Sequence, residues 1–215
     1  MKIKPLNRSE SVSTSPADKP SKRTLILKAA IDVFARQGFH HSRVSDVARA
    51  AGVADGTIYN YFKSKDELLI SLFEEKMEGI VETLRAEINP LETACDRLRR
   101  FVEVHLMLVA EQPALTNVLT LELRQSAKFM REYKAPQFTE YLTLLGEIIE
   151  YGQTRGEIKV GLDPILTRRI LFGALDELSL YWVSTKRKST ETLNQAVDEL
   201  WSICHSGVFI HPHPV

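Results

Sequence analysis

Hydrogen-bond donors of several kinds gather in one short stretch of the chain. Hydroxyl, amide and ammonium groups follow Gly56 directly, on Thr57, Tyr59, Asn60, Tyr61 and Lys65. Such groups donate to phosphate oxygens and to the edges of bases in a DNA groove. A helix that starts with small residues also presents a thin surface that a major groove accepts. These five residues, together with Gly56, are therefore the first candidates for contact with a nucleic acid.

The elements that would position these donors are helices. The spacing of apolar and capping residues predicts four of them, at 22–37, from Ser45 to Gly52, over 56–62 and at about 65–87. Ser45 is expected to cap the second helix and Asp55 the third, while Ser64 and Glu67 form a capping box that opens the fourth. Two short helices joined by a glycine-containing turn form a helix-turn-helix, whose second helix enters the major groove.

Charge is distributed unevenly along the chain. Residues 1–65 hold 12 Lys and Arg against 5 Asp and Glu, whereas residues 66–215 hold 16 against 23, although the net charge of the whole chain is zero. A basic first third followed by an acidic remainder is typical of a nucleic-acid-binding head on a body with another function. Residues 1–20 are rich in Ser, Pro and Lys and have no apolar period, so they are predicted to be disordered.

The rest of the chain keeps a helical period. Further helices are predicted over 91–111, from Pro113, over 117–126, over 129–155 with a break or kink at Pro136, over 164–185 and over 190–208. No stretch alternates as a β-strand does, so the fold class is all-α, with about nine helices. We expect three parts: a disordered tail over 1–20, a three-helix DNA-binding head over 21–66, and a ligand-binding and dimerisation body over 67–215.

Composition and motifs weigh against several other classes of protein. The chain is 44% apolar and 26% charged, as in ordinary globular proteins, and no run of apolar residues is long enough to predict a membrane span. Two cysteines suit a reducing compartment, and the N-terminus lacks the apolar core of a signal peptide, so a cytoplasmic location is expected. Motifs of nucleophilic hydrolases, phosphate loops, dinucleotide sites and zinc proteases are absent, so we expect no catalytic residue, cofactor or metal. An enzyme is the less favoured alternative.

The stretch 44–68 closely resembles the DNA-binding head of the TetR family of bacterial repressors, as does the I-x-x-F-x-x-x-G-F spacing of 31–39. The resemblance implies an all-α homodimer with one reading helix per subunit and a pocket for a small molecule in the body. It also implies that a ligand in this pocket moves the two heads to a spacing that no longer fits the operator. The DNA contacts that it implies are Ser45, Gly56, Thr57, Tyr59, Asn60, Tyr61 and Lys65. Asn60 stands where the family often has His or Arg, which leaves the base preference open.

The body is apolar along several helices, and a long apolar cavity there would suit a lipid-like ligand. Arg124 would then meet an anionic group of the ligand, unless it forms an ion pair within the protein. The segments 69–77, 121–126, 156–163 and 172–177 resemble the branch of the TetR family that represses fatty-acid degradation genes, which implies a long-chain acyl-CoA as the effector. The residues expected to line the ligand site are Phe101, His105, Arg124, Gln125, Tyr141, Leu145, Phe172 and Asp176.

Two further surfaces follow from the same pattern. Arg97, Arg99 and Arg100 are candidates for the CoA phosphates, unless this run is simply a solvated face. The last two long helices are more apolar than surface helices need to be, and an isologous interface between two copies would bury them. The apolar residues concerned are Leu171, Leu175, Leu178, Trp182, Leu193, Val197, Leu200 and Trp201.

Two alternatives keep the same head. One is a TetR-type repressor that senses a different hydrophobic molecule, as multidrug regulators do, and the other is an architectural DNA-binding protein without a ligand. Release of the DNA by an acyl-CoA rather than by a cationic dye would favour the lipid sensor. An architectural role would leave two-thirds of the chain as an oversized dimerisation device, so the preferred interpretation is a ligand-responsive repressor.

Overall fold

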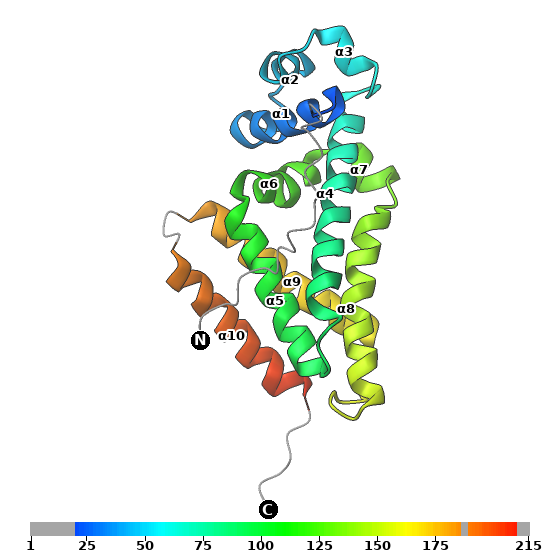
Figure 1. Cartoon of the computed structure of the whole chain (residues 1–215), viewed down its shortest axis with the longest axis vertical. Helices are drawn as coiled ribbons and strands as arrows, with labels where there is room; N and C mark the ends of the chain where they lie inside the picture. The colour runs from blue at the N-terminus through cyan, green and yellow to red at the C-terminus, as the bar shows by residue number, and fades with distance from the viewer. Residues whose placement is uncertain (1–19, 186–188, 210–215) are drawn as a thin grey trace, which may run out of the picture. The chain divides into compact units, whose positions relative to one another are not determined.

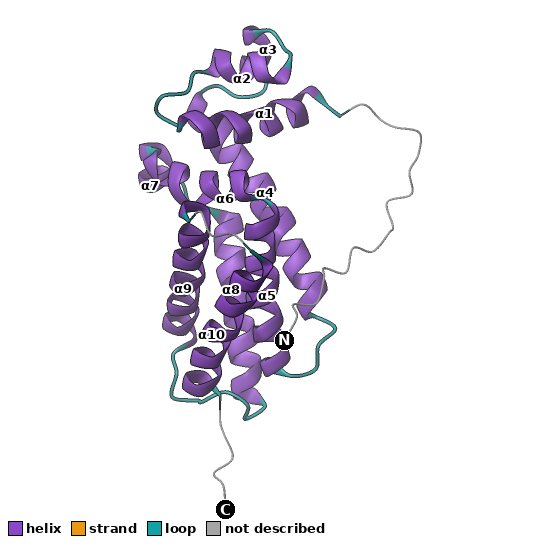
Figure 2. Ribbon diagram, turned by 90° about the vertical axis from the view of Figure 1, so that its left-hand side faces the viewer, coloured by secondary structure: helices purple, strands orange, loops and turns teal. Residues whose placement is uncertain are grey.

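The computed structural model describes residues 20–185 and 189–209, and its regular elements are helices (Figure 1 and Figure 2). The all-α class is therefore confirmed. Ten α-helices form in the described ranges, one more than the approximate count predicted, because Pro136 separates two helices where one kinked helix was an option. Except for Pro20, the tail that was predicted to be disordered lies outside the described residues.

The described chain forms two compact units. We call residues 20–76 with 113–135 the head unit, and residues 77–112 with 136–185 and 189–209 the body unit. This division differs from the boundary expected after residue 66. The first turns of the fourth helix belong to the head unit, and so does the segment Pro113–Ala135, which leaves the body unit and returns to it.

The head unit contains the helix-turn-helix and a second layer of short helices. Its elements are α1 (Lys22–Gln37), α2 (Val44–Ala51), α3 (Asp55–Tyr59), the start of α4 (Lys65–Ile88), α6 (Pro113–Asn117), the π-helical turn η1 (Val118–Glu122), the 3-10 turn η2 (Leu123–Gln125) and α7 (Ala127–Glu132). Helix α1 packs against α2, α6 and η1. Phe34, Val47 and Ile58 are fully buried between these helices, so apolar burial fixes the positions of α2 and α3.

Two helix starts in the head differ from the sequence prediction. Helix α2 begins at Val44 after Arg43, because the carboxylate of Asp46 accepts the N–H of Arg43, so Ser45 lies inside the first turn and does not cap it. Helix α3 follows Ala54 and has only five residues, so Asp55 is its first residue rather than its cap. Helix α1 matches its predicted bounds, and α4 extends one residue beyond them.

The body unit is built around α5. Its elements are the rest of α4, α5 (Ala94–Glu111), α8 (Pro136–Thr154), α9 (Pro164–Ser184) and α10 (Thr190–Val208). Helix α5 packs against α8, α9 and α10, and α8 packs against α9. The hydroxyls of Thr93 and Ser189 and the carboxylate of Asp163 each accept a backbone N–H of the first turn that follows, which explains where α5, α10 and α9 begin.

A glycine permits the closest contact in the body. A Cβ added to Gly152 on α8 would lie 2.7 Å from the Cβ of Ala94 and 2.6 Å from the Cδ1 of Ile158. Any other residue would therefore force the start of α5 and the α8–α9 loop apart. This glycine fixes how close α5 and α8 approach, and these two helices carry four of the eight residues predicted for the ligand site.

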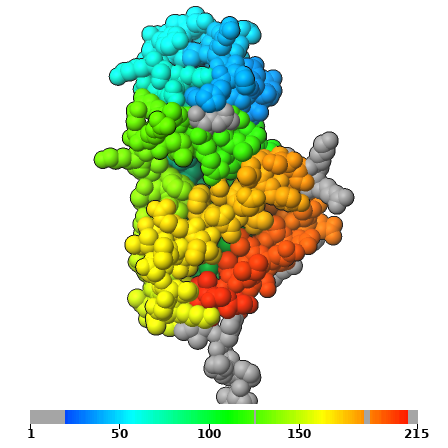
Figure 3. All heavy atoms as spheres, turned by 180° about the vertical axis from the view of Figure 1, so that it is seen from behind, coloured from blue at the N-terminus to red at the C-terminus, as the bar shows by residue number. Residues whose placement is uncertain are grey.

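The apolar residues expected at a subunit interface lie mostly inside the protomer. Leu171, Leu175, Trp182, Leu193, Val197 and Leu200 are all buried in the body unit. Helices α9 and α10 are apolar on more than one face. The set of interface residues predicted from the sequence therefore included residues that belong to the core of the protomer. The large apolar residues that they expose are Ile165, Leu166, Ile170, Tyr181 and Ile203. Figure 3 looks onto the face of the body unit where both helices reach the surface.

Candidate functional site

The outer surface of the helix-turn-helix carries large side chains that the head does not cover. Ile58 and Phe62 are buried and anchor the turn, whereas Tyr59 and Tyr61 are 57% and 44% exposed. Gly56 and Asn60 are exposed as well. Tyrosine rings combine apolar area with a polar hydroxyl, and this is why they are frequent where another macromolecule docks. This part of the head fits a partner surface that offers both base edges and phosphates.

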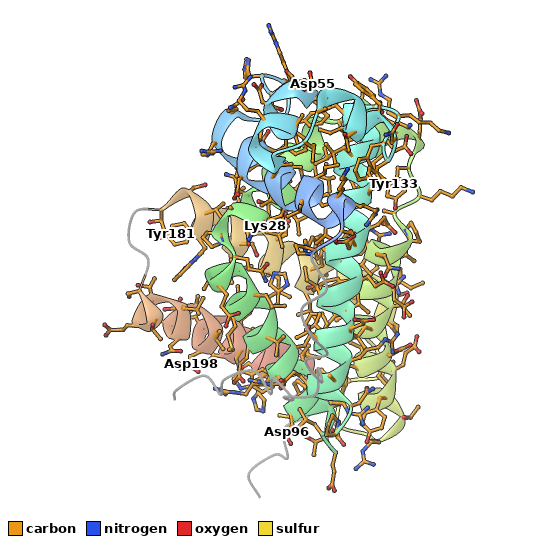
Figure 4. The ribbon with its side chains drawn as sticks, turned by 45° about the horizontal axis from the view of Figure 1, so that its top comes forward. Lys28, Asp55, Asp96, Tyr133, Tyr181 and Asp198 are labelled. Atoms are coloured by element: carbon orange, nitrogen blue, oxygen red, sulfur yellow. The ribbon has the colours of Figure 1, made fainter. Side chains whose placement is uncertain are left out.

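A depression of about 410 Å³ lies beside α3. It is lined by Ser42, Arg43, Val44, Ser45, Asp55, Tyr59 and Lys65. The structure thus brings together three predicted contacts, Ser45, Tyr59 and Lys65, while the other four lie outside this lining. The first turn of α2 and the Arg43 guanidinium attract an anion, although the Asp55 carboxylate (labelled in Figure 4) opposes it. Sequence reasoning missed Arg43, an exposed basic residue directly before the second predicted helix.

Lys65 makes contacts that the sequence did not predict. Its Nζ donates to the carbonyl oxygens of Phe39 at 2.6 Å, Ser42 at 3.0 Å and His40 at 3.3 Å. The ammonium also lies 4.4 Å from the centroid of the Phe39 ring. Burial lowers the pKa of Lys65, and the neighbouring Asp66 carboxylate partly offsets that effect. Where a phosphate contact was expected, Lys65 holds the loop that leads into α2.

A chain of hydrogen bonds runs through the body unit at His105. The Ser179 hydroxyl donates to the carbonyl oxygen of Leu175 at 2.7 Å, so its oxygen accepts from Nε2 of His105 at 3.0 Å. Nδ1 of His105 must then accept, and the Tyr141 hydroxyl donates to it at 3.0 Å. Burial lowers the pKa of His105 to about 4, which agrees with a neutral ring that donates from one nitrogen and accepts at the other.

Aromatic rings surround this polar chain. The ring of Tyr141 makes edge contacts with Phe101 at 5.2 Å and Phe172 at 5.9 Å between centroids. Phe138, which the sequence did not single out, stacks on Tyr141 and meets Phe172. Burial raises the pKa of Tyr141, and the charge of Asp176 raises it further. The structure therefore brings five of the predicted ligand residues into one cluster, and Leu145 lies fully buried on the same helix as Tyr141.

The remaining two predicted ligand residues belong to the head unit. Arg124 lies on η2, is exposed, and donates to the carbonyl oxygen of Thr120 one turn earlier. Gln125 ends the same turn, and its side chain is outside the described part of the structure. The sequence did not predict this backbone contact of Arg124, which takes up one of the N–H groups of its guanidinium.

Two family models match consecutive parts of the chain, and the second includes the segment Pro113–Ala135 of the head unit. Residues 26–72 match the family model of bacterial regulatory proteins of the tetR family, and residues 73–205 match the model of the C-terminal region of YsiA-like proteins. The fatty acid metabolism regulator protein of Bacillus subtilis is 43% identical over 163 residues, which cover 76% of this chain and 84% of the relative. The chain belongs to the TetR family.

Two solved structures of TetR-type regulators resemble this chain along most of its length. The fatty acid degradation regulator FadR from Bacillus halodurans is 37% identical, with a TM-score of 0.78 over 86% of this chain and 97% of the other. FadR from Bacillus subtilis in complex with stearoyl-CoA is 40% identical, with a TM-score of 0.76 over 83% of this chain and 97% of the other. All three relatives are named as regulators. Within the described ranges, no helix of this TetR-family chain is long and apolar enough to cross a bilayer.

The three arginines considered for CoA phosphates have partners within this TetR-family protein. Arg97 donates to the carbonyl oxygen of Leu91 and lies over the ring of Tyr151. Arg99 pairs with Glu103 and Asp198, and Arg100 pairs with Glu87 and Glu103. The run is therefore neither a vacant phosphate site nor a simple solvated face. Its charges join α4, α5 and α10, because carboxylates on each helix meet the guanidinium groups.

Acid is expected to destabilise the body through His105. Its pKa is about 4 in the folded protein, against an ordinary value of 6.5, so between these values the unfolded chain binds more protons. The contribution of His105 is therefore complete above about pH 6.5 and is lost as the pH falls towards 4. Urea unfolding at a series of pH values, compared between the parent and His105→Gln, checks this. The variant should show a flatter pH dependence; equal slopes would contradict the buried neutral ring.

Proposed function

We propose that this TetR-family protein is a transcriptional repressor that binds operator DNA as a homodimer and is released by a long-chain acyl-CoA. It would thereby control genes of fatty-acid degradation. The observation that supports this most is the 40% identity to Bacillus subtilis FadR, whose structure holds stearoyl-CoA. That match covers 97% of the other chain, so it supports the DNA-binding and effector functions together. A bacterial repressor acts on the chromosome, so we also propose a cytoplasmic location. We propose no catalytic role for the protein.

The head supports the DNA-binding part of this proposal. Tyr59 and Tyr61 are exposed, and Arg43 and Ser45 line the depression beside α3. We propose that a phosphate lies in this depression while α3 enters the major groove with Gly56, Thr57 and Asn60 towards the bases. Operator affinity should then fall as salt rises, in proportion to the number of phosphates neutralised.

The aromatic cluster of the body supports the effector part. The hydroxyl of Tyr141 is hydrogen-bonded to one ring nitrogen of His105, and the other ring nitrogen is hydrogen-bonded to Ser179. The cluster therefore offers mainly the surfaces of its aromatic rings to a bound ligand. A wall of Phe101, Phe138 and Phe172 suits an acyl chain better than a polar ligand. We propose these rings, with Leu145, as the acyl-chain site, and we retain Arg124, Gln125 and Asp176 as proposed contacts for its polar end.

The exposed faces of α9 and α10 support a homodimer. Ile170 and Ile203 are more than 70% exposed, and Ile165, Leu166 and Tyr181 add to the same two helices. So much apolar surface on neighbouring helices is typical of an interface. An isologous pairing of these helices would bury it and place two heads on a pseudo-palindromic operator. Titration of operator DNA should therefore end at two protomers per site.

The experiment that tests the proposal is a gel shift on DNA from upstream of the protein's own gene. The purified protein should retard this DNA, and stearoyl-CoA should abolish the complex. Free CoA and stearate are the matched controls, because each carries one half of the effector, and a cationic dye represents the multidrug alternative. A complex that resists stearoyl-CoA would leave a TetR-type repressor with another ligand, and failure to retard the DNA would contradict the repressor itself.

A further inference from the structure

The backbone of Phe39 is held at both its N–H and its carbonyl group within the head unit. Its N–H donates to Oε2 of Glu122 at 2.6 Å, across 83 residues of sequence. Its carbonyl oxygen accepts from Nζ of Lys65 at 2.6 Å and from the Ser42 hydroxyl at 2.8 Å. An anionic acceptor on one side and a cationic donor on the other make both bonds stronger than bonds between neutral groups. The loop that leads from α1 to α2 is thus fixed at Phe39.

The surroundings of Glu122 are arranged for this contact. Glu122 is only 9% exposed, and Gly38 lies directly against its carboxylate. Gly38 has a φ of 79°, a conformation that glycine adopts without the strain of a side chain, and this turn directs the N–H of Phe39 towards the carboxylate. Glu122 also ends η1, and π-helical turns are frequent at functional positions because they shift one side chain out of the helical register.

The segment that carries Glu122 belongs to the head unit but is flanked in the sequence by two helices of the body unit. It begins at Pro113 directly after α5 and ends at Ala135 directly before α8. Helices α5 and α8 carry the aromatic cluster proposed for the acyl chain. A second contact from the same segment reaches α4, because the Ser126 hydroxyl donates to the carboxylate of Asp66 at 2.6 Å. The segment with Glu122 is therefore joined through the chain to both helices at its two ends.

We propose that Glu122 is a positioning residue for operator recognition, and that the effector lowers operator affinity by drawing Glu122 away from the N–H of Phe39. The second half of this proposal rests on the proposed function. Without its acceptor, the loop of residues 38–42 loses its fixed position. Ser42 and Arg43, three and four residues after Phe39, line the depression proposed for a phosphate. Glu122 thus acts through the loop and itself touches no DNA.

Three variants test the proposal. Glu122→Ala removes the acceptor, Glu122→Gln keeps an oxygen that accepts the same N–H, and Glu132→Ala removes an exposed carboxylate from the same segment as a control. We expect Glu122→Ala to weaken operator binding about tenfold, Glu122→Gln to restore most of it, and Glu132→Ala to leave it unchanged. Equal operator binding by all three variants and the parent would overturn the proposal.

The decisive readout is the ratio of operator Kd with and without stearoyl-CoA. A residue that only stabilises the head would weaken binding and leave this ratio intact, which would overturn the effector half of the proposal. We expect the ratio to fall about tenfold in Glu122→Ala, and the effect of operator DNA on stearoyl-CoA affinity to fall by the same factor, since binding linkage is reciprocal. A parent protein that ignores stearoyl-CoA would contradict the proposed function, while the operator affinities would still test the positioning role.

Hydrogen exchange provides a readout that needs neither DNA nor ligand. In the full-length protein, the amides of residues 38–43 should exchange faster in Glu122→Ala than in the parent, and Glu132→Ala should match the parent. Circular dichroism establishes that each variant is folded. Unchanged exchange in Glu122→Ala would show that the loop keeps its position without the carboxylate, and this would overturn the positioning role even if the protein bound no operator.

Discussion

Replacing Arg100 by alanine is expected to lower the free energy of unfolding by about 3–5 kcal/mol. The guanidinium is buried and donates to Glu87 at 2.7 and 2.9 Å and to Glu103 at 3.1 Å. The two carboxylates are almost as buried as Arg100. Alanine would leave both in a region of low polarity without their cation, and this cost exceeds that of the lost hydrogen bonds.

Urea unfolding followed by circular dichroism measures this effect, at one fixed protein concentration because the stability of the proposed homodimer would depend on that concentration. The matched control is Arg99→Ala on the same helix. Arg99 is more exposed and pairs with the half-exposed Asp198 and with Glu103, and Glu103 would keep Arg100 as its cation, so the loss of Arg99 should cost about 1 kcal/mol or less. Similar costs for the two variants would mean that water reaches Glu87 and Glu103, and that the network is not truly buried.

Replacing Lys65 by alanine is expected to raise the operator Kd by about 10- to 100-fold. The ammonium makes three hydrogen bonds to carbonyl oxygens of the loop from Phe39 to Ser42. Without it, the carbonyl of Phe39 loses its charged donor and the approach to α2 is no longer held. Because the loop precedes Arg43 and Ser45, the depression beside α3 should lose its shape.

The salt dependence of binding separates this effect from a phosphate contact. Lys63 is exposed and lies two residues earlier, so Lys63→Ala should cost little affinity and lower the salt slope by about one. Lys65→Ala should cost much more affinity and leave that slope nearly unchanged. A slope lower by about one in Lys65→Ala would show that the ammonium leaves the loop for a phosphate, as the sequence suggested.

Local sequence patterns predicted the helices well, but they could not predict contacts between residues that are far apart in the sequence. Apolar spacing and caps such as Ser64 act within a few residues, so α1, α4 and α10 begin and end close to the predicted positions. The sequence predicted an ordinary helix over 117–126, whereas the structure has a π-helical turn and a 3-10 turn from Val118 to Gln125, and Glu122 in this stretch contacts a residue 83 positions away. Glu122 is a polar residue among apolar neighbours, and the N–H that its carboxylate accepts belongs to a loop far away in the sequence.

The candidate sites divide in the same way. Tyr59 and Tyr61 could be identified because exposed aromatic residues follow from the period of a short helix. The role of Lys65 could not, since an ammonium near a helix start suits a phosphate and a carbonyl equally well. The ion pairs of Arg99 and Arg100 could not be predicted for a related reason. Their partners Glu87, Glu103 and Asp198 lie on three different helices, and only the packing of those helices brings the charges together.

The excursion from Pro113 to Ala135 has a consequence for the order in which the protein folds during synthesis. A ribosome that has released residue 76 has released only part of the head unit, because α6, η1 and α7 are still to come. The N–H of Phe39 then lacks its acceptor, Glu122, which is synthesised 83 residues later. The DNA-reading surface is encoded near the N-terminus, but it is completed only after α5 has been made. A nascent chain therefore acquires its full head unit together with the first helices of its body unit.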